Sequence, residues 1–129
     1  MQATKRPTGT WRFIPPEDRK AKKEKQTVFV LSPLSQAERM AAWDNLKWVE
    51  QDETGNRVIR SRAYQEALKL CLDHIEEVEN FPAGKPEQWP KNGDVEGKLA
   101  FLDKLDDVSI LVIGSEIRNH SSLEEEAKN

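Results

Sequence analysis

Residue types that commonly carry chemistry are scarce in this sequence. Its 129 residues include one cysteine, Cys71, and two histidines, His74 and His120. A single cysteine excludes an internal disulfide and fits a reducing compartment. Cys71 and His74 could place two ligands on one helix face, but a structural zinc site needs four and no CxxC or HxxxH pair supplies the others. We therefore interpret Cys71 as a small core residue and expect no metal and no cofactor.

Long apolar runs and nucleotide-binding motifs are also missing. No apolar run exceeds four residues, as at 110–113, which is far short of a membrane span, and the N-terminus lacks the apolar stretch of a signal peptide. Neither G-x-x-x-x-G-K nor G-x-G-x-x-G occurs. A Cys71–histidine pair has no local context typical of a nucleophile, and the acidic runs are typical of a solvated helix face. The sequence thus predicts a cytoplasmic protein that is not an enzyme.

Charge is distributed unevenly along the chain. Residues 1–25 hold eight Lys/Arg against three acids, a net +5, whereas the remaining 104 residues hold twelve against twenty, a net −8. Three prolines and these charges predict an extended or mobile basic arm over residues 1–26. Within it, Trp11, Phe13 and Ile14 form an apolar island, which we expect to dock on the body or on a partner.

The run from Arg19 to Lys25 is the one element to which nucleic acid could bind, through its phosphates. Glu24 interrupts the run, no aromatic residue is interleaved with it, and the body of the chain is acidic. These features favour a solvated linker or contact with an acidic protein surface over nucleic acid. The candidate electrostatic contacts are Arg19, Lys20, Lys22, Lys23 and Lys25.

The first half of the body predicts a strand, a helix and a hairpin. Residues 27–31 are β-branched and aromatic, which is typical of a strand. Ser35 and Glu38 fit a capping box, with Leu34 placed to staple the first turn. The apolar face of this helix is expected to comprise Met40, Trp43 and Leu46. A turn at 52–56 between apolar pairs at 48–49 and 58–59 predicts a hairpin, although the helix could instead run on to about residue 50.

The second half of the body is predicted to be mainly helical. Apolar residues at three- and four-residue spacing predict one helix from Ser61 to Pro82; they are Tyr64, Leu68, Cys71, Leu72, Ile75 and Val78. Residues 81–93 form a proline-rich loop that Phe81 and Trp89 pin down. A helix follows around 95–105, and Asp106 or Asp107 caps a further segment whose residues 108–113 could be helix or strand.

The closing residues, Ser121 to Asn129, contain two overlapping S-x-x-E patterns that predict the start of a helix. We expect an α+β, mostly helical fold with three to four helices, a small β element and a flexible basic N-terminal arm. Residues 1–26 would be the arm, 27–120 a single globular domain and 121–129 a frayed acidic tail. The exposed apolar groups expected to bind proteins are Trp11, Phe13, Trp89 and Leu123.

Several phrases of the sequence resemble one family. "TWRFIPPEDR", "TVFVLSPLSQAERM", "ETGNRVIRSRAYQEALKLCLDHIEEVENFP" and "IGSEIRNHSSLEEEAKN" together look like the tail assembly chaperones encoded among the tail genes of long-tailed bacteriophages. The most telling pieces are the strand before the helix start at Ser35, the Gly55-Asn56 turn, the phrase Glu79-Asn80-Phe81 and the closing Ser121–Asn129.

The resemblance implies a non-enzymatic protein of the host cytoplasm. Family members coat the aggregation-prone tape measure protein, help recruit the tail tube protein and are absent from the finished particle. The partners it implies are these two proteins; self-association is a further possibility. Many members also have a longer form made by a ribosomal frameshift, and the resemblance implies that Lys128-Asn129 could mark such a site.

The basic arm does not fit the family pattern. An arm of this kind also suits a structural virion component, such as a head-tail connector, tube or capsid-associated protein, that uses its N-terminus to contact neighbours. This is the alternative interpretation, and it would place the protein in the virion.

Overall fold

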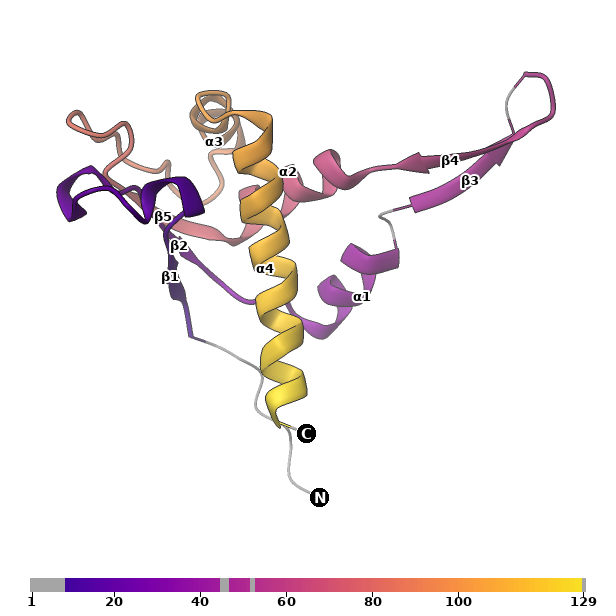
Figure 1. Cartoon of the computed structure of the whole chain (residues 1–129), viewed down its shortest axis with the longest axis horizontal. Helices are drawn as coiled ribbons and strands as arrows, with labels where there is room; N and C mark the ends of the chain where they lie inside the picture. The colour runs from indigo at the N-terminus through magenta and orange to yellow at the C-terminus, as the bar shows by residue number, and fades with distance from the viewer. Residues whose placement is uncertain (1–8, 45–46, 52, 129) are drawn as a thin grey trace.

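The computed structural model describes the backbone of residues 9–44, 47–51 and 53–128. It describes the side chains of residues 9–43, 53–56 and 62–120. In the described part, four helices and a small three-stranded antiparallel sheet form the body, with the sheet on one side of it, and a separate two-stranded sheet projects from this body (Figure 1). This confirms the α+β, mostly helical fold class.

The three-stranded sheet has the order β1-β2-β5, with every neighbour antiparallel. β2 (Val28–Leu31) confirms the strand predicted at 27–31 and lies in the centre, where Phe29 and Leu31 are fully buried. β1 (Trp11–Phe13) pairs along its outer edge, with Phe13 opposite Phe29. Trp11 and Phe13 of the apolar island are therefore part of the sheet, and Ile14 follows directly after it.

The N-terminal segment stays close to the body after β1. Two short 3-10 turns follow, η1 (Pro16–Asp18) and η2 (Lys23–Lys25). The backbone N–H of Thr27 donates to Asp18 Oδ2 at 3.0 Å, and Asn80 Nδ2 donates to the carbonyls of Glu24 and Gln26 at 2.6 and 3.1 Å. From Trp11 on, the segment expected to be extended or mobile is thus fastened to the body.

α1 (Gln36–Asp44) begins at the predicted capping box. The Glu38 N–H donates to Ser35 Oγ at 3.2 Å, and the Ser35 N–H donates to Glu38 Oε1 at 3.1 Å. The predicted apolar face was wrong, however. Met40 is 61 % and Trp43 49 % exposed, whereas Ala42 is buried, and Leu46 lies outside the described residues. Small Ala42 lets the helix lie close to the body, so the large residues are left outside.

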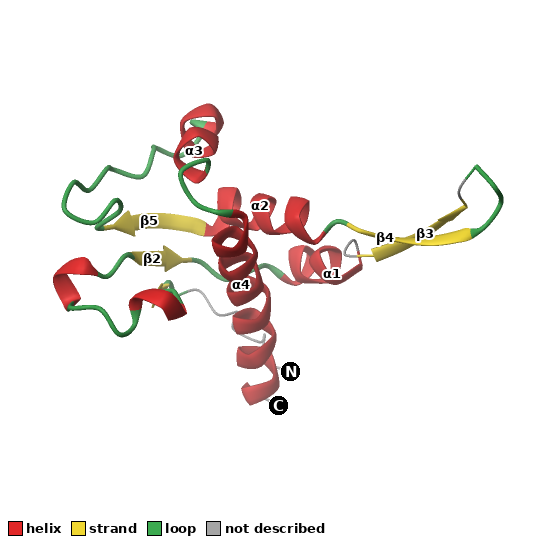
Figure 2. Cartoon of the chain, turned by 45° about the horizontal axis from the view of Figure 1, so that its top comes forward, coloured by secondary structure: helices red, strands yellow, loops and turns green. Residues whose placement is uncertain are grey.

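The hairpin consists of β3 (Lys47–Gln51) and β4 (Arg57–Ser61). Their register pairs Val49 with Ile59, and Gly55 in the turn has φ +86°, a conformation that favours glycine. The predicted hairpin is confirmed, and the alternative of a longer helix is excluded. Figures 1 and 2 both show the hairpin extending away from the other elements.

α2 (Ala63–His74) is shorter than predicted, because the chain turns into β5 at Ile75 (β5, Ile75–Glu79). Ile75 and Val78 are buried, as the periodicity required, but they are buried from a strand. Val78 lies opposite Phe29 in the sheet. A helix through residue 82 would have left β2 unpaired on this side, so tertiary pairing overrode the local pattern.

The proline-rich loop is held as predicted. Trp89 is buried and meets the Phe101 ring edge-on with centroids 5.2 Å apart, and Phe81 lies 5.6 Å from the same ring. α3 (Val95–Leu102) supplies Phe101 and begins at Asp94, whose side chain accepts the Gly97 N–H at 2.9 Å.

α4 (Asp107–Lys128) crosses the molecule and packs mainly on α2. Asp106 caps it by accepting the Ser109 N–H at 2.7 Å, so residues 108–113 are helical. Ile110, Ile113 and Ile117 are fully buried along one stripe. The helix continues unbroken past Ser121 and Ser122, and the helix start predicted there was wrong. Within the described part of the chain, no helix is both long and apolar enough to cross a membrane.

Candidate protein-binding groove

A seam runs between the N-terminal segment and the first turns of α4. Two anchors close it at one end: Trp11 Nε1 donates to Glu116 Oε1 at 3.2 Å, and the Trp11 ring stacks on His120 with centroids 3.7 Å apart. At the other end, Ser109 Oγ donates to Glu17 Oε1 at 3.5 Å. The seam therefore joins segments about a hundred residues apart in the sequence.

Three hollows follow one another along this seam. The largest, about 360 Å³, lies between residues 13–19 and the exposed side of α4. Its apolar walls include Phe13, Pro16, Val108, Leu111 and Val112. A second hollow of about 160 Å³ shares Pro16, Val108 and Val112 with it, and adds Pro15 and Glu17. We call these two joined hollows the α4 groove.

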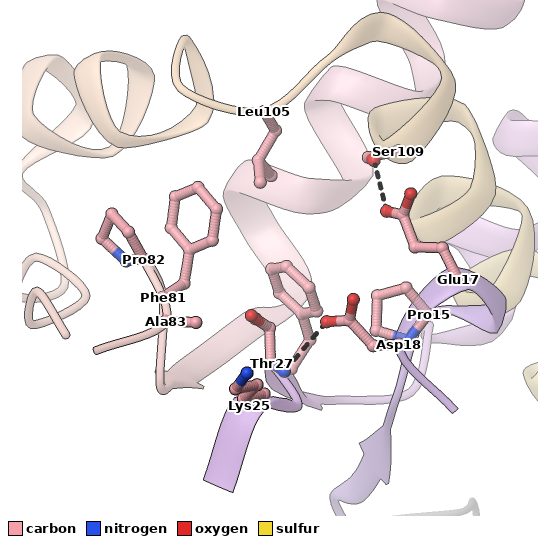
Figure 3. Close-up of a pocket in the computed structure, with 11 residues that line it drawn as sticks. Pro15, Glu17, Asp18, Lys25, Thr27, Phe81, Pro82, Ala83, Leu105 and Ser109 are labelled. Atoms are coloured by element: carbon pink, nitrogen blue, oxygen red, sulfur yellow. Dashed lines mark hydrogen bonds between the residues drawn. The ribbon is translucent and has the colours of Figure 1, made fainter. Parts of the chain in front are cut away.

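The third hollow, about 220 Å³, continues the seam past Pro15 toward the proline-rich loop (Figure 3). Figure 3 shows Phe81, Pro82 and Ala83 on one side and Glu17 and Asp18 on the other. Both carboxylates already accept hydrogen bonds, Glu17 from Ser109 and Asp18 from the Thr27 N–H. Both carboxylates of this hollow thus help to hold the fold.

The α4 groove combines open apolar surface with an acidic border. Val108 is 68 % and Leu111 38 % exposed, so two aliphatic side chains lie open together in the first turns of α4. The border carries the carboxylates of Glu17, Asp106 and Glu116, with Arg19 as the one cation among the residues that line the groove. Hydrogen bonds from the Ser109 backbone and side chain hold the pKa of Asp106 below its usual value, so this carboxylate is charged near neutrality.

Arg19 is one of the predicted electrostatic contacts, and its side chain is already used. Its Nε donates to the Ile14 carbonyl at 3.0 Å, and its guanidinium lies 5.7 Å from the Phe13 ring centroid. The other predicted cations, at positions 20, 22, 23 and 25, have exposed side chains, and Lys25 reaches the third hollow. Their contact with a partner stays a prediction.

The structure separates the predicted apolar contacts. Phe13 and Trp89, expected to be exposed, are both 6 % exposed, because each fills the chain's own core. Trp11 is half-buried between Glu116 and His120. Leu123 lies on α4, and its side chain is outside the described set. Of the four, Phe13 and Trp11 border the seam, and their role in binding stays a prediction.

Sequence reasoning missed Val108 and Leu111 as surface residues. Both belong to the apolar segment 108–113, for which the sequence left helix and strand open and so did not separate the buried side from the exposed one. The helical spacing offered one signal: Ile110, Ile113 and Ile117 already form a complete buried stripe, so Val108 and Leu111 fall to its side.

A second cluster joins a serine, a histidine and a glutamate. Ser32 Oγ lies 3.2 Å from His74 Nδ1, and His74 Nε2 lies 2.6 Å from Glu38 Oε2. These are the residue types of a nucleophilic triad, but the three hollows of the seam are lined by other residues. The Ser32 N–H also donates to the His74 carbonyl at 2.8 Å. The cluster therefore fastens the end of β2 and the start of α1 to the end of α2.

Cys71 lies one turn before His74 but does not join this cluster. It is fully buried, its Sγ points to the Ile110 carbonyl at 3.8 Å, and burial raises its pKa to about 12. A thiol with this pKa is a poor nucleophile and a poor metal ligand near neutrality. Among the described residues, no group of three or more His, Cys, Asp or Glu is arranged to hold a metal ion.

Comparison of the chain with protein-family models, curated proteins and solved structures found no match.

Proposed function

We propose that this protein is a non-enzymatic phage tail assembly chaperone that binds the tape measure protein and aids assembly of the tail tube. The resemblance of the sequence phrases to that family supports the particular role. The observation that supports protein binding is the α4 groove, with its exposed Val108 and Leu111 beside three carboxylates.

The chemistry of the groove defines the kind of segment that fits it. The aliphatic walls of the groove favour apolar side chains of a partner. When such side chains cover Leu111 and Val108, each Å² of apolar surface removed from water stabilises the complex by about 25 cal/mol. The acidic border favours a segment whose apolar residues are flanked by Lys or Arg. A long tape measure protein would offer such segments repeatedly, so several chaperone copies would coat one client.

Two observations support a role without catalysis. Cys71 is buried with a raised pKa, and the Ser32–His74–Glu38 cluster joins three elements of the fold. Both sets of residues thus serve the fold.

The groove can be tested with a matched pair of leucines. Leu111 in the groove and Leu99 on α3 are both 38 % exposed, and both lie on helices. We expect wild-type protein and Leu99→Glu to raise the soluble yield of a co-expressed tape measure protein. Leu111→Glu should lose most of that effect, because it places a fourth carboxylate in the apolar wall.

The readout is the soluble fraction of the tape measure protein, together with circular dichroism of each purified variant to verify folding. Equal loss in both variants would show that the effect is not specific to the groove. No gain in yield with the wild-type protein would contradict the chaperone proposal itself.

A structural virion component is the second candidate, and the projecting β3–β4 hairpin is the observation that favours it. The assay is mass spectrometry of purified virions. A chaperone should be absent from them, and a stoichiometric copy number would favour the structural role. The N-terminal segment is less suited to reach a neighbour than its sequence suggests, because from Trp11 on it is tied to the body.

A further inference from the structure

The β3–β4 hairpin has two free edges. Its strands pair with each other and with no strand of the three-stranded sheet in the described part of the chain, and both figures show it standing clear of the body. A two-stranded hairpin is marginally stable alone in water, and an open edge offers unpaired N–H and C=O groups to another strand. A partner strand at such an edge would pair these backbone groups.

Charge distinguishes the two edges. β4 contains Arg57 and Arg60 without an acid, so joining two β4 edges would bring four arginines together. β3 contains Lys47 and Glu50, so joining two β3 edges is neutral overall. Like charges on adjacent strands are destabilising, which favours the β3 edge.

The sequence of β3 suits antiparallel pairing about a two-fold axis at Val49. In that register Val49 meets Val49 of the second copy, Lys47 meets Gln51 and Trp48 meets Glu50. Ile59 is the partner of Val49 inside each hairpin. The joined sheet would thus carry one row of four β-branched residues, Ile59, Val49, Val49 and Ile59, across its middle, and no like charges would stand opposite each other.

We propose that two copies of this chain join their β3 edges into a four-stranded antiparallel sheet centred on Val49. β3 runs outward from α1, so antiparallel pairing places the two bodies at opposite ends of that sheet, which spans about 17 Å along its five-residue strands. The α4 groove of each copy lies on the body and stays open. The dimer is therefore independent of client binding.

Cysteine cross-linking tests the edge and the register. The only native cysteine, Cys71, is buried and does not compete. We expect Val49→Cys to form a covalent dimer on oxidation, while Ile59→Cys, which is separated from its counterpart by the two β3 strands, stays monomeric. A mixture of Lys47→Cys and Gln51→Cys should cross-link more than either variant alone, because these positions face each other only in the antiparallel register.

Light scattering of the full chain provides the second measurement. The wild-type protein should be a dimer at high concentration and dissociate on dilution, and Val49→Glu should be monomeric because it sets two carboxylates opposite each other. A wild-type protein that stays monomeric at the highest concentration reached would overturn the proposal. So would cross-linking of Ile59→Cys as fast as Val49→Cys, which would assign the contact to β4. Val49→Glu should still solubilise the tape measure protein, so the two proposals can fail separately.

Discussion

At the scale of single residues, Gly114 sets how closely α2 and α4 approach. A Cβ placed there would lie 2.6 Å from both the Cα and the Cβ of Ala67, a distance that real Cβ atoms do not tolerate. Because one of these atoms is backbone, the clash can be relieved only by moving the helices apart. The pair is thus a small-residue contact between the two helices that pack most extensively on each other.

We predict that Gly114→Ala destabilises the protein by about 1–2 kcal/mol. Overpacking at so close a contact should cost about 2–3 kcal/mol, in the upper part of the usual range, and the higher helix propensity of alanine offsets about 1 kcal/mol of this cost. Chemical denaturation measures the difference, and Ser115→Ala, the neighbouring position without this contact, is the control. An unchanged or higher stability for Gly114→Ala would mean that the helices separate without cost.

The same scale shows the limit of pattern analysis. Periodicity assigned Met40 and Trp43 to the buried face of α1, but both are exposed. The prediction failed because apolarity alone does not say how close a helix lies to its neighbours. The close approach of the helices depends on the small residues Ala42 and Gly114. A hydrophobic pattern gives such small residues little weight, so it does not predict this approach. The Ser32–His74–Glu38 cluster was equally hidden, since its members are brought together only by folding.

At the scale of elements, the sequence predicted helix starts and turns best, since these depend on residues close together in the chain. The capping box at Ser35, the turn at Gly55 and the cap at Asp106 were all readable, because each needs contacts within a few residues. The end of α2 was not readable. Cys71, Ile75 and Val78 keep a helical spacing, and the strand is decided by pairing with β2, more than forty residues earlier in the chain.

The cap of α1 can be tested by Ser35→Ala, which removes the hydroxyl that accepts the Glu38 N–H. We expect a loss of about 1 kcal/mol, the usual value for an N-cap serine. Thermal or denaturant unfolding gives the number. Ser35→Asp should keep most of the stability, because its carboxylate also accepts that N–H, and a comparable loss in this variant would argue against capping as the cause.

Glu38 also makes the stability of the protein depend on pH. Burial alone would raise its pKa, but hydrogen bonds from the Ser35 backbone, His74 and the Ser35 side chain outweigh burial and hold the pKa below 4.5. A carboxyl with a lowered pKa adds stability above its unfolded pKa and loses it as the pH falls through its folded pKa.

We therefore predict that Glu38→Gln flattens the fall in unfolding midpoint below pH 4.5. The effect should be modest, since water reaches one side of the carboxylate. Asp73→Asn, on the exposed side of α2, is the control. An equal flattening in that variant would mean that the loss of any one negative charge produces the effect, whether or not the carboxylate is hydrogen-bonded.

At the scale of the whole molecule, the N-terminal segment is structural from Trp11 on. We predict that Phe13→Ala costs about 3–5 kcal/mol, as expected for an aromatic residue removed from a core. Arg12→Ala is the control, because its ion pair with Glu79 is exposed and should contribute less than about 1 kcal/mol. Denaturant unfolding distinguishes the two, and equal small losses would mean that the segment is only loosely attached.

The bond from Trp11 to Glu116 has a consequence for synthesis. A ribosome makes Trp11 about a hundred residues before it makes Glu116 and His120, the two residues that the Trp11 side chain contacts. Until both have emerged, the tryptophan lacks these contacts, and contacts of such long range form late in folding. The nascent chain therefore exposes this apolar side chain until α4 has been made.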